Sequence, residues 1–135
     1  MLGNQKTLGK LKALRLATCP PATQSIPINI KNRQKCIDEA HYGPLNPDEP
    51  NDAYWEAKAK MFNDSVEDAK SARCGNCAAF NRKKEILDCI AGAIGGTDAW
   101  DVIDISEIGF CEFYDFKCGA TRTCDAWVSG GPITD

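Results

Sequence analysis

Several features that would point to a membrane or an exported protein are missing from this 135-residue chain. No apolar run approaches the roughly 18–20 residues that a membrane-spanning helix needs. The continuous apolar stretch of a secretory signal is also missing near the N-terminus, because Lys10, Lys12 and Arg15 interrupt it. We therefore expect neither a membrane span nor export.

Residue groups that carry common enzyme chemistry are missing too. The chain has a single histidine, His41, and no Ser-His-Asp set, glycine-rich nucleotide loop or paired-carboxylate motif. The Gly95-Gly96 pair is typical of the end of a helix rather than of a phosphate-binding loop. We expect a protein that is not an enzyme and has no small-molecule substrate.

Acidic residues are missing from the first 35 positions, although the net charge is −3. Residues 1–35 carry a charge of +7, and the other hundred residues carry −10. The basic residues are too sparse for a nucleic-acid site. Leu8, Leu11 and Leu14 follow a helical spacing, which predicts a short docking helix, with a solvated tail as the alternative. Its partner would be a membrane surface, an acidic protein or the chain's own body.

The hydrophobic pattern predicts short helices in the middle of the chain. They are expected over Asn32–Ala40, after the N-caps Asn51 and Ser65, and over Lys83–Ile94. The alternating apolar residues of Ser25–Ile30 predict an extended segment instead.

The C-terminal part is rich in aromatic and β-branched residues from Val102 onward. Phe110–Lys117 and Thr121–Val128 are predicted to form two strands around a turn at Cys118–Ala120. The sequence thus predicts a small, loop-rich α+β domain over residues 51–135. Residues 1–50, here called the N-terminal arm, are expected to be an extended, basic and proline-rich attachment to it.

The eight cysteines are the most unusual part of the composition, and they call for disulfides, metal or redox chemistry. Without an export signal, metal binding is favoured. Cys74-Gly-Asn-Cys77 is a C-x2-C pair whose thiolates can reach neighbouring irons from one tight turn. Cys89 follows after 11 intervening residues and Cys111 after 21 more. This spacing predicts a [4Fe–4S] cluster held by Cys74, Cys77, Cys89 and Cys111, which would staple the fold.

Aromatic residues concentrate in the same part of the chain. They are Phe80, Trp100, Phe110, Phe113, Tyr114, Phe116 and Trp127. An apolar wall of this kind would keep water from the sulfurs of a cluster, and burial helps to set its reduction potential.

These residues carry a resemblance to a known family. The Cys74-x2-Cys77 pair, Cys89 and Gly109-Phe110-Cys111 with its following aromatics resemble the high-potential iron–sulfur proteins. The resemblance covers about residues 74–116. It implies an electron-carrying [4Fe–4S] cluster with the four cysteines named above as ligands. It also implies that the aromatic residues Phe80, Phe110 and Tyr114 shield the cluster.

A wider pattern is similar to small iron–sulfur proteins of this type that bacteriophages encode. It includes the run Tyr42–Pro47, Tyr54-Trp55, the Cys-Gly-Asn-Cys turn and the ending Cys118–Trp127. The similarity implies a phage product located in the virion or in the host cytoplasm. Its partners would be other virion subunits, bound through the N-terminal arm, or a redox partner.

The cysteines could instead form a structural zinc site or disulfides. A structural zinc site commonly uses two C-x2-C pairs or a mixture of Cys and His, whereas this chain has one such pair and His41 lies far from it in the sequence. A disulfide-stabilised virion protein without redox function is a further alternative. Cys19 and Cys36 are expected to be reduced thiols or crosslinks between subunits.

Cys118 and Cys124 are open to two assignments. They flank a predicted turn, so a hairpin could bring them together as a disulfide. Alternatively, one of them replaces Cys89 or Cys111 as a ligand. For the cluster itself two roles are predicted: a one-electron carrier, or a structural staple of a virion protein that cannot bury enough apolar area alone.

Overall fold

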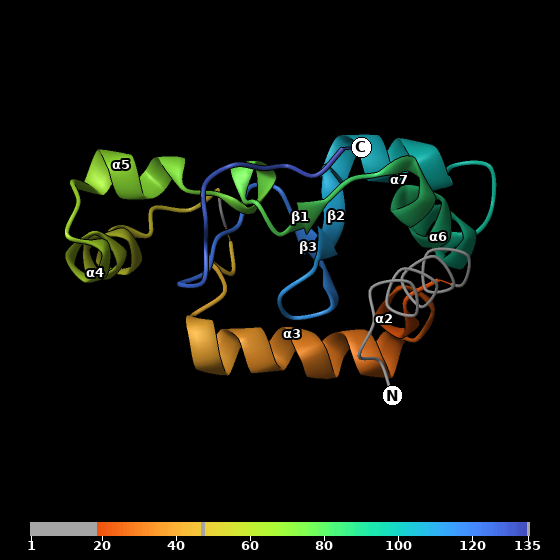
Figure 1. Cartoon of the computed structure of the whole chain (residues 1–135), viewed down its shortest axis with the longest axis horizontal. Coiled ribbons are helices and arrows are strands. Elements are labelled where there is room, and N and C mark those ends of the chain that lie inside the picture. Colours follow the sequence, from red (N-terminus) through yellow and green to blue (C-terminus); the bar gives the residue numbers. More distant parts are fainter. Residues whose placement is uncertain (1–18, 47, 135) are drawn as a thin grey trace, which may run out of the picture.

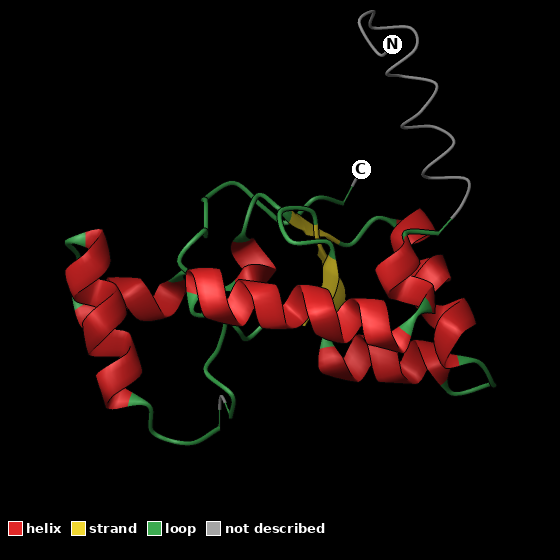
Figure 2. Cartoon of the chain, turned by 90° about the horizontal axis from the view of Figure 1, so that it is seen from below, coloured by secondary structure: helices red, strands yellow, loops and turns green. Residues whose placement is uncertain are grey.

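The chain folds into a small α+β structure, described by a computed structural model over residues 19–46 and 48–134. Short helices surround one antiparallel sheet, with α3 along one side and α6 and α7 on the other (Figure 1). Helices α4 and α5 form a separate pair at the opposite end of the molecule from α6 and α7 (Figure 2). The elements, in order, are α2 (Pro21–Gln24), α3 (Ile26–Ala40), α4 (Asp52–Phe62), α5 (Val66–Ser71), η1 (Cys74–Asn76), β1 (Phe80–Asn81), α6 (Lys84–Ile94), α7 (Ala99–Ser106), β2 (Ile108–Cys111) and β3 (Phe116–Gly119).

The sheet has the order β1-β2-β3, and both neighbouring pairs are antiparallel. Phe80 lies opposite Cys111, and Cys111 in turn lies opposite Phe116. Because successive side chains of a strand point to opposite faces, Phe110 and Cys111 face different sides of the sheet. That alternation divides the aromatic residues between two cores.

Residues 21–24 and 26–40 of the N-terminal arm are helical, so the prediction of an extended segment over Ser25–Ile30 is wrong, whereas the helix predicted over Asn32–Ala40 is the later part of α3. Helix α3 begins at Ile26, ahead of the predicted start at Asn32, and the Ser25 hydroxyl caps it by accepting the Ile28 N–H at 3.4 Å. Pro27 occupies the first turn, where its missing N–H costs nothing. The alternating isoleucines that predicted a strand are exposed: Ile26, Ile28 and Ile30. The docking helix predicted around Leu11 lies outside the described residues.

The three helices predicted after position 50 are confirmed. Asn51 precedes α4 as its N-cap residue, although its side chain donates to Asn46 O and Glu49 O instead of accepting a helical N–H. Ser65 caps α5 by accepting the Asp68 N–H at 3.1 Å. Helix α6 ends at Ile94, and the next residue, Gly95, caps it with a φ of 74° that glycine adopts readily.

The predicted strands at the C-terminal side are displaced. Residues 99–106 form α7, and the hairpin turn falls at residues 112–115, where Asp115 takes a φ of 53°. Thr121–Val128 forms no strand among the described residues and contributes a single bridge, between Thr123 and Gly43. Residues 118–120, where the sequence predicts the turn, therefore contain the end of β3.

Two main cores lie on the two sides of the sheet. The first, here called the thiol core, contains Cys36, Ala40, Tyr42, Cys74, Cys77, Ala79, Phe80, Phe116, Cys118 and Cys124. The second, here called the helical core, contains Ala22, Ile86, Ile90, Ala91, Ala99, Ile103 and Phe110. A smaller cluster around Trp55 joins α4 to α5. Residues from both sides of position 50 share the thiol core, because Cys36 of α3 is fully buried in it.

Candidate functional site

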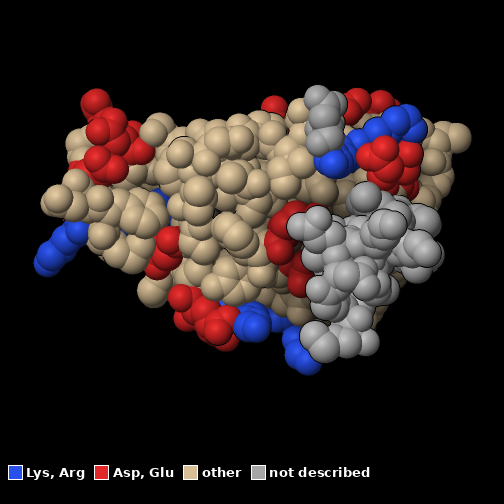
Figure 3. Space-filling view, in the orientation of Figure 1, with Lys and Arg blue, Asp and Glu red and all other residues tan. Residues whose placement is uncertain are grey.

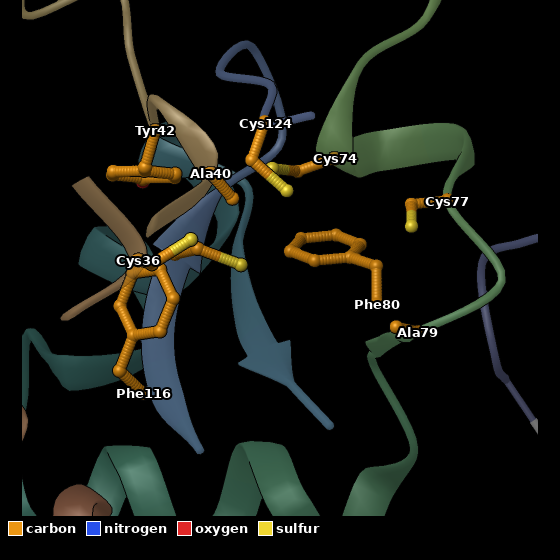
Figure 4. Close-up of a cluster of buried hydrophobic side chains, with 10 residues drawn as sticks. Cys36, Ala40, Tyr42, Cys74, Cys77, Ala79, Phe80, Phe116 and Cys124 are labelled. Carbon is orange, nitrogen blue, oxygen red and sulfur yellow. The ribbon is translucent and has the colours of Figure 1, made fainter. Parts of the chain in front are cut away.

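Six free cysteines gather on the thiol-core side of the sheet. Five of them line one cavity, here called the thiol pocket: Cys74, Cys77, Cys111, Cys118 and Cys124. The sixth, Cys36, is fully buried in the same core. The pocket has a volume of about 20 Å³, and Phe80, Phe113 and Trp127 complete its wall. Figure 4 shows the Phe80 ring lying between Cys77 and the other labelled thiols.

The 3₁₀ turn η1 sets the spacing of the first two thiols. The Cys77 N–H donates to Cys74 O at 2.9 Å, and the turn docks on the segment after β3 because Gly75 N donates to Ala120 O at 2.9 Å. A Cβ on Gly75 would lie 3.0 Å from the Ala120 Cβ. The close approach of the two chain segments therefore favours glycine at this position of the C-x2-C pair.

Asn76 holds the same turn through its side chain. Its Oδ1 accepts the Arg73 N–H at 3.1 Å and the Trp127 indole N–H at 2.8 Å, and its Nδ2 donates to Ser71 O at 2.8 Å. Trp127 is thereby fixed as a wall of the pocket. The turn thus couples the thiol pair to the segment that follows Cys124.

Cys111 reaches the pocket from the end of β2. Burial raises the pKa of its thiol to about 12, while the backbone N–H groups of Tyr114 and Phe113 donate to its sulfur and oppose that rise. Backbone donors of this kind stabilise a sulfur that carries negative charge. The tight 112–115 turn therefore supplies hydrogen bonds that a thiolate ligand uses.

Two thiol pairs are in hydrogen-bond contact. The Cys36 S–H donates to the Cys124 sulfur, and this bond, the Ala126 N–H and the charge of Lys58 lower the pKa of Cys124 to about 7. The Cys118 S–H donates to the Cys74 sulfur, and that bond and burial raise the pKa of Cys118. Cys124 is thus a thiol of this group that ionises readily.

Lys58 and its neighbours fix the loop that carries Cys124. The Lys58 side chain is buried. Its Nζ donates a hydrogen bond to Cys124 O at 2.7 Å and lies 4.3 Å from the centre of the Phe62 ring. His41 is exposed, and its Nδ1 is 2.6 Å from a carboxylate oxygen of Asp125. These contacts hold Cys124 in place without a regular strand.

Cys89 is not a member of this group, contrary to the prediction. Its sulfur is bonded to that of Cys19, with a Cα–Cα distance of 5.4 Å and a sequence separation of 70. A sulfur in a disulfide is not a thiolate, so Cys89 cannot complete the ligand set while that bond is present. The predicted set therefore keeps three members in the pocket: Cys74, Cys77 and Cys111.

The predictions for the other four cysteines are partly correct. Cys19 is neither a free thiol nor, in this structure, a crosslink between subunits. Cys118 and Cys124 are free thiols, so the hairpin disulfide between them is not formed. Cys36 is a free thiol, as one of the two predictions for it stated.

The predicted aromatic shield is divided. Phe80 lines the thiol pocket and is almost fully buried. Phe110 faces the other side of the sheet and packs in the helical core, so it does not cover the thiols. Tyr114 is half-buried against the thiol core and lines a shallow outer groove of about 520 Å³ with Phe113. Phe113 lines both the groove and the pocket.

The described residues form no ready-made site for a metal ion. Over the described residues, no three His, Cys, Asp or Glu side chains converge as ligands of one metal ion. A structural zinc ion needs four donors around a single point. The thiolates of a cluster bind different irons and do not need to converge in that way.

The comparisons give no further guide. Models of protein families, curated proteins and solved structures were all compared with the chain, and none matches it. Across residues 19–46 and 48–134, no helix has the length and apolar character required to cross a bilayer. The resemblance to high-potential iron–sulfur proteins therefore stays a prediction from the sequence.

Proposed function

We propose that this protein binds an iron–sulfur cluster through Cys74, Cys77, Cys111 and Cys124. One observation carries the proposal: five thiols from separate parts of the chain line a single pocket walled by aromatic rings. The residues that line the pocket include no carboxylate and no histidine, so the donor set is purely sulfur. All-thiolate sets suit iron–sulfur clusters and zinc among biological metals.

Cys124 takes the place predicted for Cys89. Its sulfur accepts hydrogen bonds from the Ala126 N–H and from Cys36, as the Cys111 sulfur accepts the N–H groups of its own turn. Cys118, the other thiol of the pocket, acts as a donor toward Cys74 and is thereby assigned a supporting role. Hydrogen bonds to ligand sulfurs adjust the potential of a cluster.

The size of the pocket sets a condition on this proposal. A volume of about 20 Å³ accommodates about one water-sized body. A cubane therefore requires the thiols to move outward, and Phe113, which is 54% exposed, is the wall residue most free to yield. When bound, the cluster would supply metal–thiolate bonds and a one-electron couple.

A structural role is favoured over electron transfer. The four proposed ligands come from η1, β2 and the loop after β3, which share only short elements of regular structure. A bound cluster would join these segments covalently and offset the entropy of ordering them. The further proposal that this is a phage virion component rests on the sequence resemblance alone.

A second candidate follows from the two thiol pairs. Cys36 with Cys124, and Cys74 with Cys118, are already in hydrogen-bond contact. Without metal, an oxidant such as a small-molecule disulfide would remove two electrons and two protons from each pair and leave two protein disulfides. This is the alternative of a disulfide-stabilised protein.

Anaerobic purification followed by iron, sulfide and zinc analysis separates these functions. We expect about four irons per chain with matching sulfide, as for a cubane. Cys111→Ser and Cys124→Ser should each lose the iron, whereas Cys89→Ser should keep it. Stoichiometric zinc, or no metal together with two new disulfides, would overturn the proposal.

A further inference from the structure

The exposed side of α7 is an apolar and acidic surface that the described residues leave uncovered. Asp98, Asp101, Val102 and Ile105 follow one another at the i, i+3, i+4, i+7 spacing of a single helix face. Val102 is 45% exposed and Ile105 is 85% exposed, while Ile103 on the opposite side is fully buried. We call this surface the α7 face.

Negative charge dominates the chain around the α7 face. Residues 85–115 contain eight acidic residues and no Lys or Arg. Figure 3 shows acidic side chains at the end of the molecule that carries α6 and α7, beside Lys and Arg side chains there, and further acidic side chains at the α4–α5 end. A ligand for the α7 face should therefore be basic and present apolar side chains of its own.

Residues 1–18 of this chain have that composition. They carry Lys6, Lys10, Lys12 and Arg15 without an acidic residue, and the leucines 8, 11 and 14 recur among them. The point where this segment joins the fold is also fixed in space, because Cys19 is bonded to Cys89 of α6. Helix α6 packs against α7 in the helical core.

We propose that residues 1–18 dock on the α7 face of the same chain. The attachment at Cys19 makes the docking intramolecular, which raises the effective concentration of the segment to roughly the millimolar range. Eighteen residues are long enough to reach along the face, since even at the short rise of about 1.5 Å per residue they span about 27 Å, more than twice the length of α7. The inference does not depend on the proposed metal site.

Limited trypsin digestion of the full-length protein tests this docking. The rate of cleavage after Arg15 under native conditions measures how often the segment is free. Asp101→Lys on the α7 face, together with Asp104→Lys on the next turn of the same helix, should speed that cleavage roughly fivefold at low salt by repelling the basic residues. Ile105→Ser should speed it as well, since it removes the most exposed apolar contact. Combining the α7 reversal with Lys10→Glu and Lys12→Glu should restore slow cleavage.

Matched changes at the far end serve as controls. Glu49→Lys with Glu56→Lys alters the net charge equally, and Met61→Ser removes an apolar side chain that is 51% exposed on α4. Neither should change the cleavage rate. Equal rates for all variants would overturn the inference. A cleavage rate that falls with rising protein concentration would also overturn it, because the segment would then dock on a second copy.

Discussion

Gly109 lies so close to Phe80 that a substitution of this single residue tests how β2 packs against β1. A Cβ at this position would lie 2.6 Å from Phe80 Cζ and 3.0 Å from Asn81 O. Phe80 is almost fully buried and forms one wall of the thiol pocket, so its ring cannot swing away. Gly109→Ala should lower the free energy of unfolding by about 1–3 kcal/mol, measured by urea denaturation.

Gly92 is the matched control for that substitution. It lies within α6, and a Cβ there would meet no atom within 4 Å. Gly92→Ala should raise the free energy of unfolding by about 0.5–1 kcal/mol, since alanine is the better helix former. Equal effects of the two substitutions would contradict the packing of β2 against Phe80.

Tyr42 should make the protein sensitive to alkali. Its ring packs edge-on against Phe116 at 5.0 Å, and burial raises the pKa of its phenol above the ordinary 10.0. A group whose folded pKa is raised stabilises the fold below its unfolded pKa and loses that contribution as the pH rises. The urea midpoint should therefore fall above about pH 10, and it should fall less in Tyr42→Phe.

Phenolate absorbance checks the same point independently. Ionisation of Tyr42 at its ordinary pKa in the folded protein would contradict the burial of its phenol. Comparison of the variant with the parent protein cancels the contribution of the thiols, which also titrate in this range.

At the scale of elements, the Cys19–Cys89 disulfide joins the start of the described chain to α6. It closes a loop, with a sequence separation of 70, that includes α3, α4 and α5. Replacing both cysteines by serine should lower the free energy of unfolding by roughly 2–4 kcal/mol, because the unfolded chain gains freedom. The iron content should not change. Loss of iron in this variant would return Cys89 to the ligand set.

The helices that the sequence predicts correctly are those whose ends are marked by local signals. The α5 and α6 helices carry their own signals, a serine cap and a glycine end. The start of α3 escapes prediction because Ile26, Ile28 and Ile30 alternate like a strand although none of them is buried. Alternation predicts a strand only when one set of residues faces a core.

Helix α7 and the hairpin escape prediction for a related reason. The β-branched residues of α7 favour a strand by local preference, but Ile103 packs on α6 at helical spacing and tertiary burial decides. The hairpin turns at 112–115, where Asp115 adopts a left-handed conformation. Asp tolerates that conformation more readily than most residues, although the sequence alone does not single it out.

At the scale of the whole molecule, the site is only partly predictable. The Cys74–Cys77 pair and Cys111 can be found because a turn and a glycine-aromatic pair mark them locally. The place of Cys36 and Cys124, and the Cys19–Cys89 bond, depend on contacts between distant segments, and pairing among eight cysteines cannot be deduced from spacing. The face of Phe110 likewise depends on the register of β2, which only the fold fixes.

The division into two cores predicts how the molecule should respond to loss of the metal that we propose. The helical core is held by Ile86, Ile90 and Ile103 and by the disulfide, none of which lines the thiol pocket. The turns around η1 and the 119–129 segment are held to each other and to Ala40, Gly43 and Glu107 by isolated backbone hydrogen bonds, and most of their residues lie outside helices and the sheet. A chelator should therefore increase amide hydrogen exchange in residues 74–81 and 119–129 while leaving α6 and α7 protected.

Cys124→Ser is the matched variant for this experiment, since it removes one proposed ligand and keeps both cores otherwise intact. Its exchange pattern without chelator should equal that of the chelated parent protein. Faster exchange throughout the chain would mean that the two cores unfold as one unit. Unchanged exchange would mean that the thiol pocket holds its segments without metal, and the stapling role would be wrong. Thiols pack on one side of the sheet and branched aliphatic side chains pack on the other. Because the two sides are held by different chemistry, we expect their local stabilities to differ.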